Sequence, residues 1–316
     1  MDEKVKVACL SVFTGIALTA GKLAVGLITR SVSVLSEAAH SGLDLVAALV
    51  AYFSVRQSAR PADEVHRYGH GKFENLAAVV EALLIVAAGV MIVVEAVPRL
   101  YGPAQLARLD LGLAVMAVSA AANLVVSTLL MRTAARTNSP ALEADAWHLR
   151  TDVYTSAGVL VSLAVIRFTG WHILDPLVAI GIALLIFKAA FRLLRESLGS
   201  IVDVRLPEAE EEVIHAVLRG HAGKFVQFHD LRTRRAGPDR HIDFHLVVPG
   251  CWSVAQVHDL CDTLESEICR QLPGASVLIH TEPCRPESGD CYLCRVHISL
   301  AHCPQQRCGR EERGEG

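Results

Sequence analysis

Two histidine–aspartate pairs stand at the same spacing in two apolar parts of the chain. His40 and Asp44 are four residues apart, and so are His148 and Asp152. Residues four apart lie on one face of a helix, so each pair would present an imidazole beside a carboxylate. If the two faces meet, four N and O ligands at about 2.0–2.2 Å suit tetrahedral Zn²⁺. One pair alone could be a local hydrogen bond within its helix, but the repetition on two segments favours a shared metal site.

Three further potential ligands lie close together in a polar segment: Asp63, His66 and His70. Gly69 and Gly71 flank the last of them, which predicts a tight backbone at that point. This set is either a metal site at the cytoplasmic surface or an ordinary solvated loop.

The last third of the chain holds more ligand types, on different predicted elements, so the sequence alone does not pair them. These are His229, His245, His258, His280 and Glu282. Beyond them, Cys291 and Cys294 form a C-x-x-C pair that could hold one zinc with His297 and either Cys284 or His302. The alternative for this tail is a disordered extension with incidental thiols.

Long apolar segments must position the first two pairs. The chain has 316 residues, of which 52% are hydrophobic and 20% are charged. This balance, concentrated before residue 196, excludes a single water-soluble globule and a disordered chain. A bilayer core about 30 Å thick needs about 20 apolar residues in a helix. Six such spans are predicted: Val7–Ile28, Val32–Val55, Leu76–Val97, Leu109–Met131, Ala146–Phe168 and Leu177–Leu194.

The distribution of basic residues near the span ends predicts the orientation. One side holds Lys4, Lys6, Arg56, Arg60, Arg67, Lys72, Arg132, Arg136, Arg192 and Arg195, and the other holds Arg30, Arg99, Arg108 and Arg167. The richer side should be cytoplasmic, which puts both termini in the cytosol of a multi-pass protein of the inner (plasma) membrane. A net charge of −3 and 5% aromatic residues give no surface for nucleic acid.

The segment after residue 206 has the pattern of a small soluble domain. It predicts helices at Pro207–Arg219 and Ser253–Gln271, a hairpin of Gln227–Arg235 with Arg240–Val248, and a last strand at Ala275–His280. The order αββαβ is typical of a two-layer α+β domain. The expected organisation is a six-helix transport domain over 1–200, a cytoplasmic α+β domain over 201–283 and a Cys-rich tail over 284–316.

Other polar residues inside the spans also need a reason, because a charge at mid-membrane costs about 2.5–3.5 kcal/mol. We expect Lys22 to extend toward the membrane surface and Asn123 to form a hydrogen bond between helices. Glu81 is expected near an interface or facing protein.

These features together resemble the cation diffusion facilitator family, over about residues 5–283, and most closely its bacterial metal-efflux antiporters. The resemblance is carried by four stretches: Ser36-Glu-Ala-Ala-His-Ser-Gly-Leu-Asp44, the loop from Pro61 to Lys72 with its Gly-His-Gly-Lys, His148-Leu-Arg-Thr-Asp152 with Ser156, and His229-Asp-Leu-Arg-Thr-Arg234.

The resemblance implies a homodimeric divalent metal/proton antiporter, a secondary active transporter and not an enzyme, which exchanges Zn²⁺ for protons. It also implies a ferredoxin-like, metallochaperone-like cytoplasmic domain. The implied sites are a transport site of His40, Asp44, His148 and Asp152, a loop site of Asp63, His66 and His70, and a cytoplasmic site of His229, His245, His258, His280 and Glu282 that joins the protomers through metal. An ion pair between protomers is implied for Lys72 and Asp203.

Two positions depart from the family pattern. Bacterial members of this branch often carry Asp where this chain has His40, and a second imidazole favours zinc over iron or manganese. Glu282 stands where an Asp is usual, which leaves the geometry of the cytoplasmic site less defined.

Three rival interpretations remain open. The first is the same kind of transporter acting on cadmium, cobalt, nickel, iron or manganese. The second is a membrane-anchored metal sensor, although sensing needs no costly site inside the membrane. The third is an intramembrane metalloenzyme, which lacks support because the chain has no His-Glu-x-x-His and no nucleophile arrangement.

Overall fold

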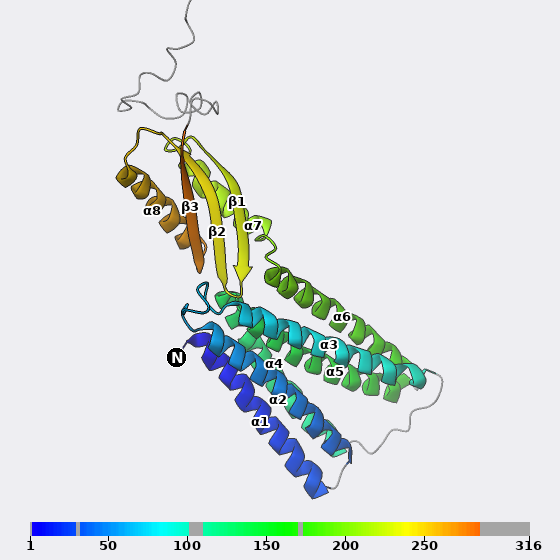
Figure 1. Cartoon of the computed structure of the whole chain (residues 1–316). Coiled ribbons are helices and arrows are strands. Elements are labelled where there is room, and N and C mark those ends of the chain that lie inside the picture. Colours follow the sequence, from blue (N-terminus) through cyan, green and yellow to red (C-terminus); the bar gives the residue numbers. More distant parts are fainter. Residues whose placement is uncertain (1, 30–31, 101–109, 170–172, 285–316) are drawn as a thin grey trace, which may run out of the picture. The chain divides into compact units, whose positions relative to one another are not determined.

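The computed structural model describes residues 2–29, 32–100, 110–169 and 173–284. The chain divides into two compact units, Met1–Val202 and Asp203–Gly316. The first is helical, and the second contains a small sheet (Figure 1).

Six long helices make up the first unit. They are α1 (Glu3–Thr29), α2 (Val32–Ser58), α3 (Lys72–Arg99), α4 (Asp110–Thr137), α5 (Pro140–Thr169) and α6 (Leu174–Ile201). Within the described part of the chain, five of them contain a stretch long and apolar enough to cross a membrane. The other, α5, carries Glu143, Asp145, Arg150 and Asp152 in its first half. The helical membrane fold is confirmed, and each helix extends past its predicted apolar span at one or both ends, because helical hydrogen bonding continues into polar residues that an apolar window excludes.

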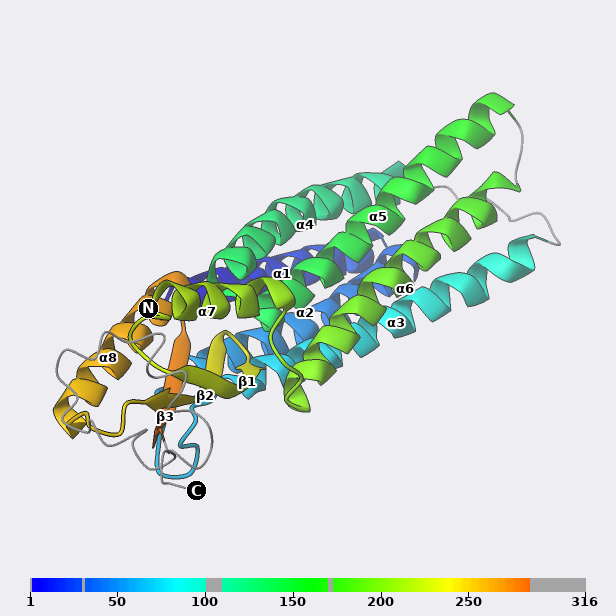
Figure 2. The same cartoon turned by 90° about the horizontal axis from the view of Figure 1, so that it is seen from above.

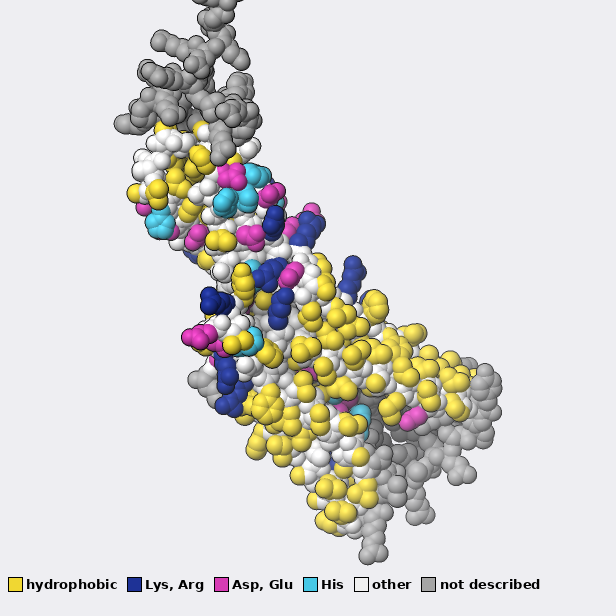
Figure 3. All heavy atoms as spheres, viewed as in Figure 1, with side chains coloured by type: hydrophobic (Ala, Val, Ile, Leu, Met, Phe, Trp, Pro, Cys, Tyr) yellow, Lys and Arg dark blue, Asp and Glu magenta, His cyan; other side chains and the backbone are white. Residues whose placement is uncertain are grey.

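The helices associate in adjacent pairs, α1 with α2, α3 with α6 and α4 with α5, as two views of the bundle show (Figures 1 and 2). Small residues permit close approach where α3 meets α6. A Cβ added at Gly89 would lie only 2.7 Å from Cε1 of Phe187, so a larger residue would force the Phe187 ring to shift. The outer surface of the bundle carries large apolar side chains such as Phe13 and Phe191, which is expected of a surface that faces lipid (Figure 3).

The second unit has the predicted order of elements: α7 (Glu208–Gly220), β1 (Gln227–Ala236), β2 (Asp239–Val248), α8 (Val254–Gln271) and β3 (Ala275–Pro283). β2 is the central strand, antiparallel to β1 and parallel to β3. The hairpin turns at Gly237, whose φ of +61° suits glycine. Ser253 caps α8 in a capping box with Gln256, as the sequence predicts for Ser253.

One face of this sheet forms the core with both helices. Ile242, Phe244 and Leu246 of β2 are almost fully buried, and they pack with residues of α7 and α8 such as Ile214 and Leu264. Burial on alternate positions of β2 leaves its other residues on the opposite face, where His241, Asp243 and His245 are only partly buried. The histidines therefore occupy the face that the helices do not cover.

Candidate metal centres

The first candidate centre lies where α2 meets α5. Nε2 of His148 lies 3.2 Å from Oδ1 of Asp44. Nε2 of His40 lies 3.9 Å from the same oxygen and 3.7 Å from Oδ1 of Asp152. Ligand atoms of His40, Asp44 and Asp152 all lie within 4.8 Å of one another. The two sequence pairs are thus brought together, and their donor set of two imidazoles and two carboxylates suits a dication.

Neighbouring polar side chains orient this group. Nδ2 of Asn123, on α4, donates to Oδ2 of Asp152 at 3.4 Å, which confirms the expected hydrogen bond between helices. Lys22, on α1, does not extend to the surface as predicted. Its side chain is buried, and Nζ donates to Oγ of Ser41 at 2.8 Å. The hydroxyl of Ser41 offers an acceptor inside the bundle, next in sequence to His40.

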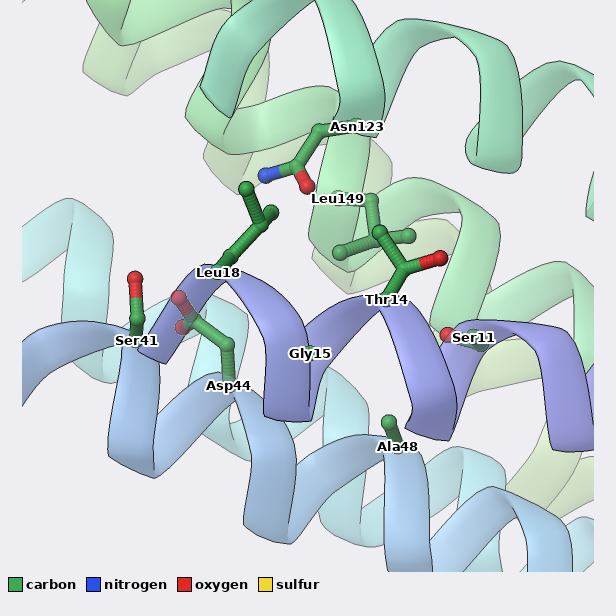
Figure 4. Close-up of a pocket in the computed structure, with 9 residues that line it drawn as sticks. All are labelled: Ser11, Thr14, Gly15, Leu18, Ser41, Asp44, Ala48, Asn123 and Leu149. Carbon is green, nitrogen blue, oxygen red and sulfur yellow. The ribbon is translucent and has the colours of Figure 1, made fainter. Parts of the chain in front are cut away.

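A cleft runs beside this centre between α1, α2, α4 and α5 (Figure 4). Its lining includes the polar side chains of Ser11, Thr14, Ser41, Asp44 and Asn123. Figure 4 shows Asp44 and Ser11 on opposite sides of Gly15 along this cleft. Polar side chains of three helices therefore line the cleft beside the Asp44 carboxylate.

The second candidate centre is the loop between α2 and α3. Oδ1 of Asp63 lies 3.4 Å from Nδ1 of His66, and Oδ2 of Asp63 lies 3.3 Å from Nε2 of His70. The loop turns at Gly69, whose φ is +83°. Backbone N–H groups of His66 and Val65 donate to the Asp63 carboxylate at 2.6 and 2.9 Å. The His66 amide, followed by that of Val65, holds the pKa of Asp63 below its usual value of 3.8, so this ligand is ionised at neutral pH.

The third candidate centre lies on the exposed face of the sheet. The strand register aligns His229 with His245 and His245 with His280, so the three rings form a row across β1, β2 and β3. Glu282 contacts all three: its carboxylate oxygens lie 2.9 Å from His245, 3.7 Å from His229 and 3.8 Å from His280. Figure 3 shows histidine and acidic side chains gathered on this unit. The donor set again suits a divalent metal.

Asp230 joins this row although the sequence analysis did not include it. It forms a potential metal group with His229 and His245. Its φ is +53°, and the strand register shifts between His229 and Arg232, so an irregularity in β1 places its carboxylate beside the histidines. The sequence signal was its position next to His229.

Several predicted site residues are not brought together. His258 lies on α8 beside Asp262, at 3.5 Å, and belongs to none of the potential metal groups found among the described residues. Lys72 donates to the carbonyl of Ile201 at 3.4 Å, and Asp203 lies 3.4 Å from Arg234. Their pairing between protomers stays a prediction. Cys284 is described and partly buried, whereas the other tail ligands Cys291, Cys294 and His297 lie outside the described residues.

Comparison with known proteins assigns the family. The family model described as cation efflux transmembrane domain matches residues 8–202, and the model described as cation efflux protein, cytoplasmic domain matches residues 206–284. The chain belongs to the cation diffusion facilitator family. It is therefore a cation-efflux transporter with a membrane-spanning helical region and a cytoplasmic domain.

Two curated relatives agree with this assignment. An uncharacterized transporter of Synechocystis, sll1263, is 40% identical over 87% of this chain and 89% of its own length. The cation-efflux pump FieF of Salmonella paratyphi A is 33% identical over 81% of this chain and 85% of its own length. A solved structure of the metal-bound C-terminal domain of the CzcD transporter from Thermotoga maritima is 28% identical, covers 25% of this chain and 94% of that chain, and has a TM-score of 0.23.

Proposed function

We propose that this transporter exports Zn²⁺ from the cytosol in exchange for protons, by alternating access at His40, Asp44, His148 and Asp152. The observation that carries the proposal is the convergence of the two His-x-x-x-Asp pairs, with Nε2 of His148 at 3.2 Å from Asp44 and Nε2 of His40 at 3.7 Å from Asp152. The working unit is a homodimer in the inner (plasma) membrane, with both termini and the second unit in the cytosol.

Exchange follows from the chemistry of the ligands. Zinc binds neutral imidazole and ionised carboxylate, so metal and protons compete for the same atoms. With Asp44 ionised, its contact with Nε2 of His148 needs a proton on that nitrogen, and this proton must leave Nε2 before both atoms can bind one metal ion. At cytosolic pH the site loses protons and takes zinc. On a more acidic outer side, protons displace the metal, and the protonated ligands return the site empty.

The ligand types support zinc as the preferred cargo. Two imidazoles and two carboxylates form an intermediate donor set, softer than a site with one histidine and three carboxylates. His40 supplies the second imidazole. A competition experiment that adds cadmium, iron, cobalt, nickel or manganese to the zinc flux assay orders these cations directly.

The cytoplasmic centres would regulate transport. Zinc at Asp63, His66 and His70, and at the histidine row with Glu282, adds binding energy only to a conformation that assembles those ligands, and so raises its population. His258 would reach such a centre from the second protomer, since within one chain it lies apart from the row.

Proteoliposomes with a set pH gradient test the proposal. Wild-type protein should move zinc and protons in opposite directions, and His40→Ala and Asp152→Ala should remove both fluxes. Glu196→Gln is a matched control, since this exposed carboxylate on α6 pairs only with the surface residue Arg192 in the contacts observed among the described residues. Zinc binding without any flux in wild-type protein would instead identify a sensor, and unchanged flux in both ligand variants would refute the site.

A further inference from the structure

Two carboxyl groups inside the bundle take part in none of the three centres. Glu81 on α3 and Asp145 on α5 are each 0% exposed. All four of their carboxylate oxygens are buried and have no hydrogen-bond partner among the described residues. The sequence analysis expected Glu81 at an interface or facing protein, and it faces protein. Asp145 directly precedes the predicted apolar span that begins at Ala146, and the sequence assigned it no role.

The two carboxyl groups act on each other across the contact between α3 and α5. Asp145 is the charged group that interacts electrostatically with Glu81. Ser11 of α1 and His148 of α5 interact with Asp145. The hydroxyl of Ser11 is itself buried and, like the Asp145 carboxylate, forms no hydrogen bond of ordinary geometry with a described partner. It is nevertheless the side chain of a third helix that acts on Asp145.

Apolar residues near the pair on the same helices belong to one buried cluster. Ala78, Ala82 and Ile85 of α3 pack with Ala144 of α5 and with Ile186 of α6 in one buried cluster. Two ionised carboxylates in such a place would lose their hydration and repel each other, at a cost of several kcal/mol per ion. Removing one charge by protonation relieves the repulsion and the desolvation cost of that group.

Neither a lysine nor a predicted metal site among the described residues neutralises the charge of Glu81 and Asp145. The buried ammonium groups of Lys4 and Lys22 contact other residues, with Lys4 at 3.1 Å from Glu74 and Lys22 at 2.8 Å from Ser41. In the part of the chain that the structure describes, the groups of three or more potential metal ligands contain neither Glu81 nor Asp145. A proton is the cation that fits.

Asp145 lies close to the proposed transport site along α5. Asp145 precedes His148 by three residues, one helical turn, on α5. Nδ1 of His148 is buried without a hydrogen-bond partner among the described atoms, whereas Nε2 of the same ring contacts Asp44. Ser11 lines the same cleft as Asp44 (Figure 4), so the cleft extends from the ligand Asp44 to the hydroxyl that acts on Asp145.

We propose that Glu81 and Asp145 form a second proton-carrying centre, which binds one proton of the exchange cycle outside the metal-ligand set. This inference rests on the proposed zinc/proton exchange. Because both groups are fully buried, they exchange this proton with water only when α3 and α5 move relative to each other, as alternating access requires. The pair would thus hold a proton in one conformation and release it in the other, with no covalent change beyond the O–H bond.

The first test counts protons moved per zinc ion in proteoliposomes, with a trapped pH indicator and a trapped zinc indicator. Glu81→Gln, which fixes a neutral side chain of the same shape, should lower the count by one and should change zinc affinity less than threefold. Asp145→Asn should do the same, and it keeps the test informative if Glu81→Gln fails to fold. Glu95→Gln is the matched control, an exposed carboxyl on the same helix. An unchanged proton count in both Glu81→Gln and Asp145→Asn overturns the inference.

The second test does not depend on transport. Difference infrared spectroscopy of purified wild-type protein, with and without zinc, should show a protonated-carboxyl band that Glu81→Gln or Asp145→Asn alters. If wild-type protein moves zinc without protons, the exchange mechanism fails, yet this band still reports whether the pair holds a proton. A zinc-insensitive spectrum without such a band overturns the proton-carrying centre even when exchange is observed.

Discussion

Asp44 and His148 lie 104 positions apart in the sequence, yet Nε2 of His148 lies 3.2 Å from Oδ1 of Asp44. Asp44 Oδ1 also faces Nε2 of His40, at 3.9 Å. One carboxylate thus stands between the imidazoles of two helices and balances their charge when either is protonated. This relationship makes Asp44 the side chain that joins both halves of the proposed transport site.

Replacement of Asp44 by Asn should therefore stop transport. The amide keeps the size of the side chain but loses the negative charge that attracts a dication, so we expect zinc flux to fall by at least about 100-fold. Flux of radioactive zinc into proteoliposomes measures the loss. A variant that retains half of the wild-type flux would show that Asp44 is not a ligand.

Asn123→Ala should weaken the site without removing it. Its amide holds the Asp152 carboxylate at 3.4 Å, and loss of a group that orients a ligand costs about 10–100-fold in metal affinity. Competitive zinc titration should give a lower affinity at an unchanged stoichiometry. Thr128→Ala on the same helix is the control, since its hydroxyl bonds only to the carbonyl of Leu124 in the contacts found within the described ranges.

Zinc binding at the loop should be lost in mild acid through the histidines and not through Asp63. The His66 amide lowers the pKa of Asp63 below its usual 3.8, so this carboxylate stays ionised down to about that pH. Zinc binds neutral imidazole, so protons compete with the metal for His66 and His70 and binding should weaken as the pH falls below neutral. Calorimetric titration with zinc, in a background lacking Asp44 and His245, isolates this site. Retention of full affinity at pH 5 would contradict the assignment.

His245 should matter most at the cytoplasmic centre. It is the histidine shared by both potential metal groups on the sheet. His245→Ala should remove zinc binding by residues 203–284, a unit with its own hydrophobic core, whereas His258→Ala should leave binding to the dilute monomeric domain within about threefold. Equal losses from the two substitutions in the monomer would show that His258 belongs to the row after all.

The stability of the second unit should depend on an ion pair between α7 and β2. Arg240, with its side chain 5% exposed, donates to Glu210 at 2.7 and 3.1 Å. Burial raises the pKa of Glu210, but the bonds from Arg240 and the nearby Arg235 outweigh it and leave the pKa below its usual 4.5. Glu210→Gln should lower the free energy of unfolding by about 1.5–3 kcal/mol at pH 7.

The sign of its pH dependence follows from that lowered pKa. A carboxyl whose pKa is lower in the folded state contributes its stability fully above the unfolded value, here about 4.5, and loses it as pH falls through the folded value. The difference between wild type and Glu210→Gln should therefore shrink below about pH 4.5. Thermal unfolding of residues 203–284 at several pH values measures this difference in stability. Asp259→Asn, on the exposed side of α8, is the control. A difference that is constant from pH 7 to 3 would argue against the ion pair.

The sequence was sufficient to predict what depends on local pattern. Apolar length predicted the membrane helices, and alternation predicted the buried face of β2 with Phe244 and Leu246. The repeated spacing around His40 and His148 predicted that the two pairs share a function. Each of these signals is a pattern along the chain, so it can be recognised without knowing how the elements pack.

The sequence could not predict which side chains from different elements come close together in the fold. Asp145 was missed because charges near it end the apolar window, although the helix continues through it. Asp230 was missed because an irregularity in β1, which no periodic pattern predicts, places its carboxylate beside the histidine row. The neighbourhood of Lys22 and Ser41 likewise depends on how α1 packs on α2.

The most direct test of the central claim is anomalous diffraction at the zinc edge from crystals of the full-length transporter grown with zinc. The account predicts a peak inside the helical unit, with Nε2 or Nδ1 of His40 and His148 and a carboxylate oxygen of Asp44 and Asp152 all within about 2.0–2.2 Å of it. A zinc-loaded crystal that shows peaks only at the cytoplasmic centres, with those four side chains turned away from one another, would contradict it.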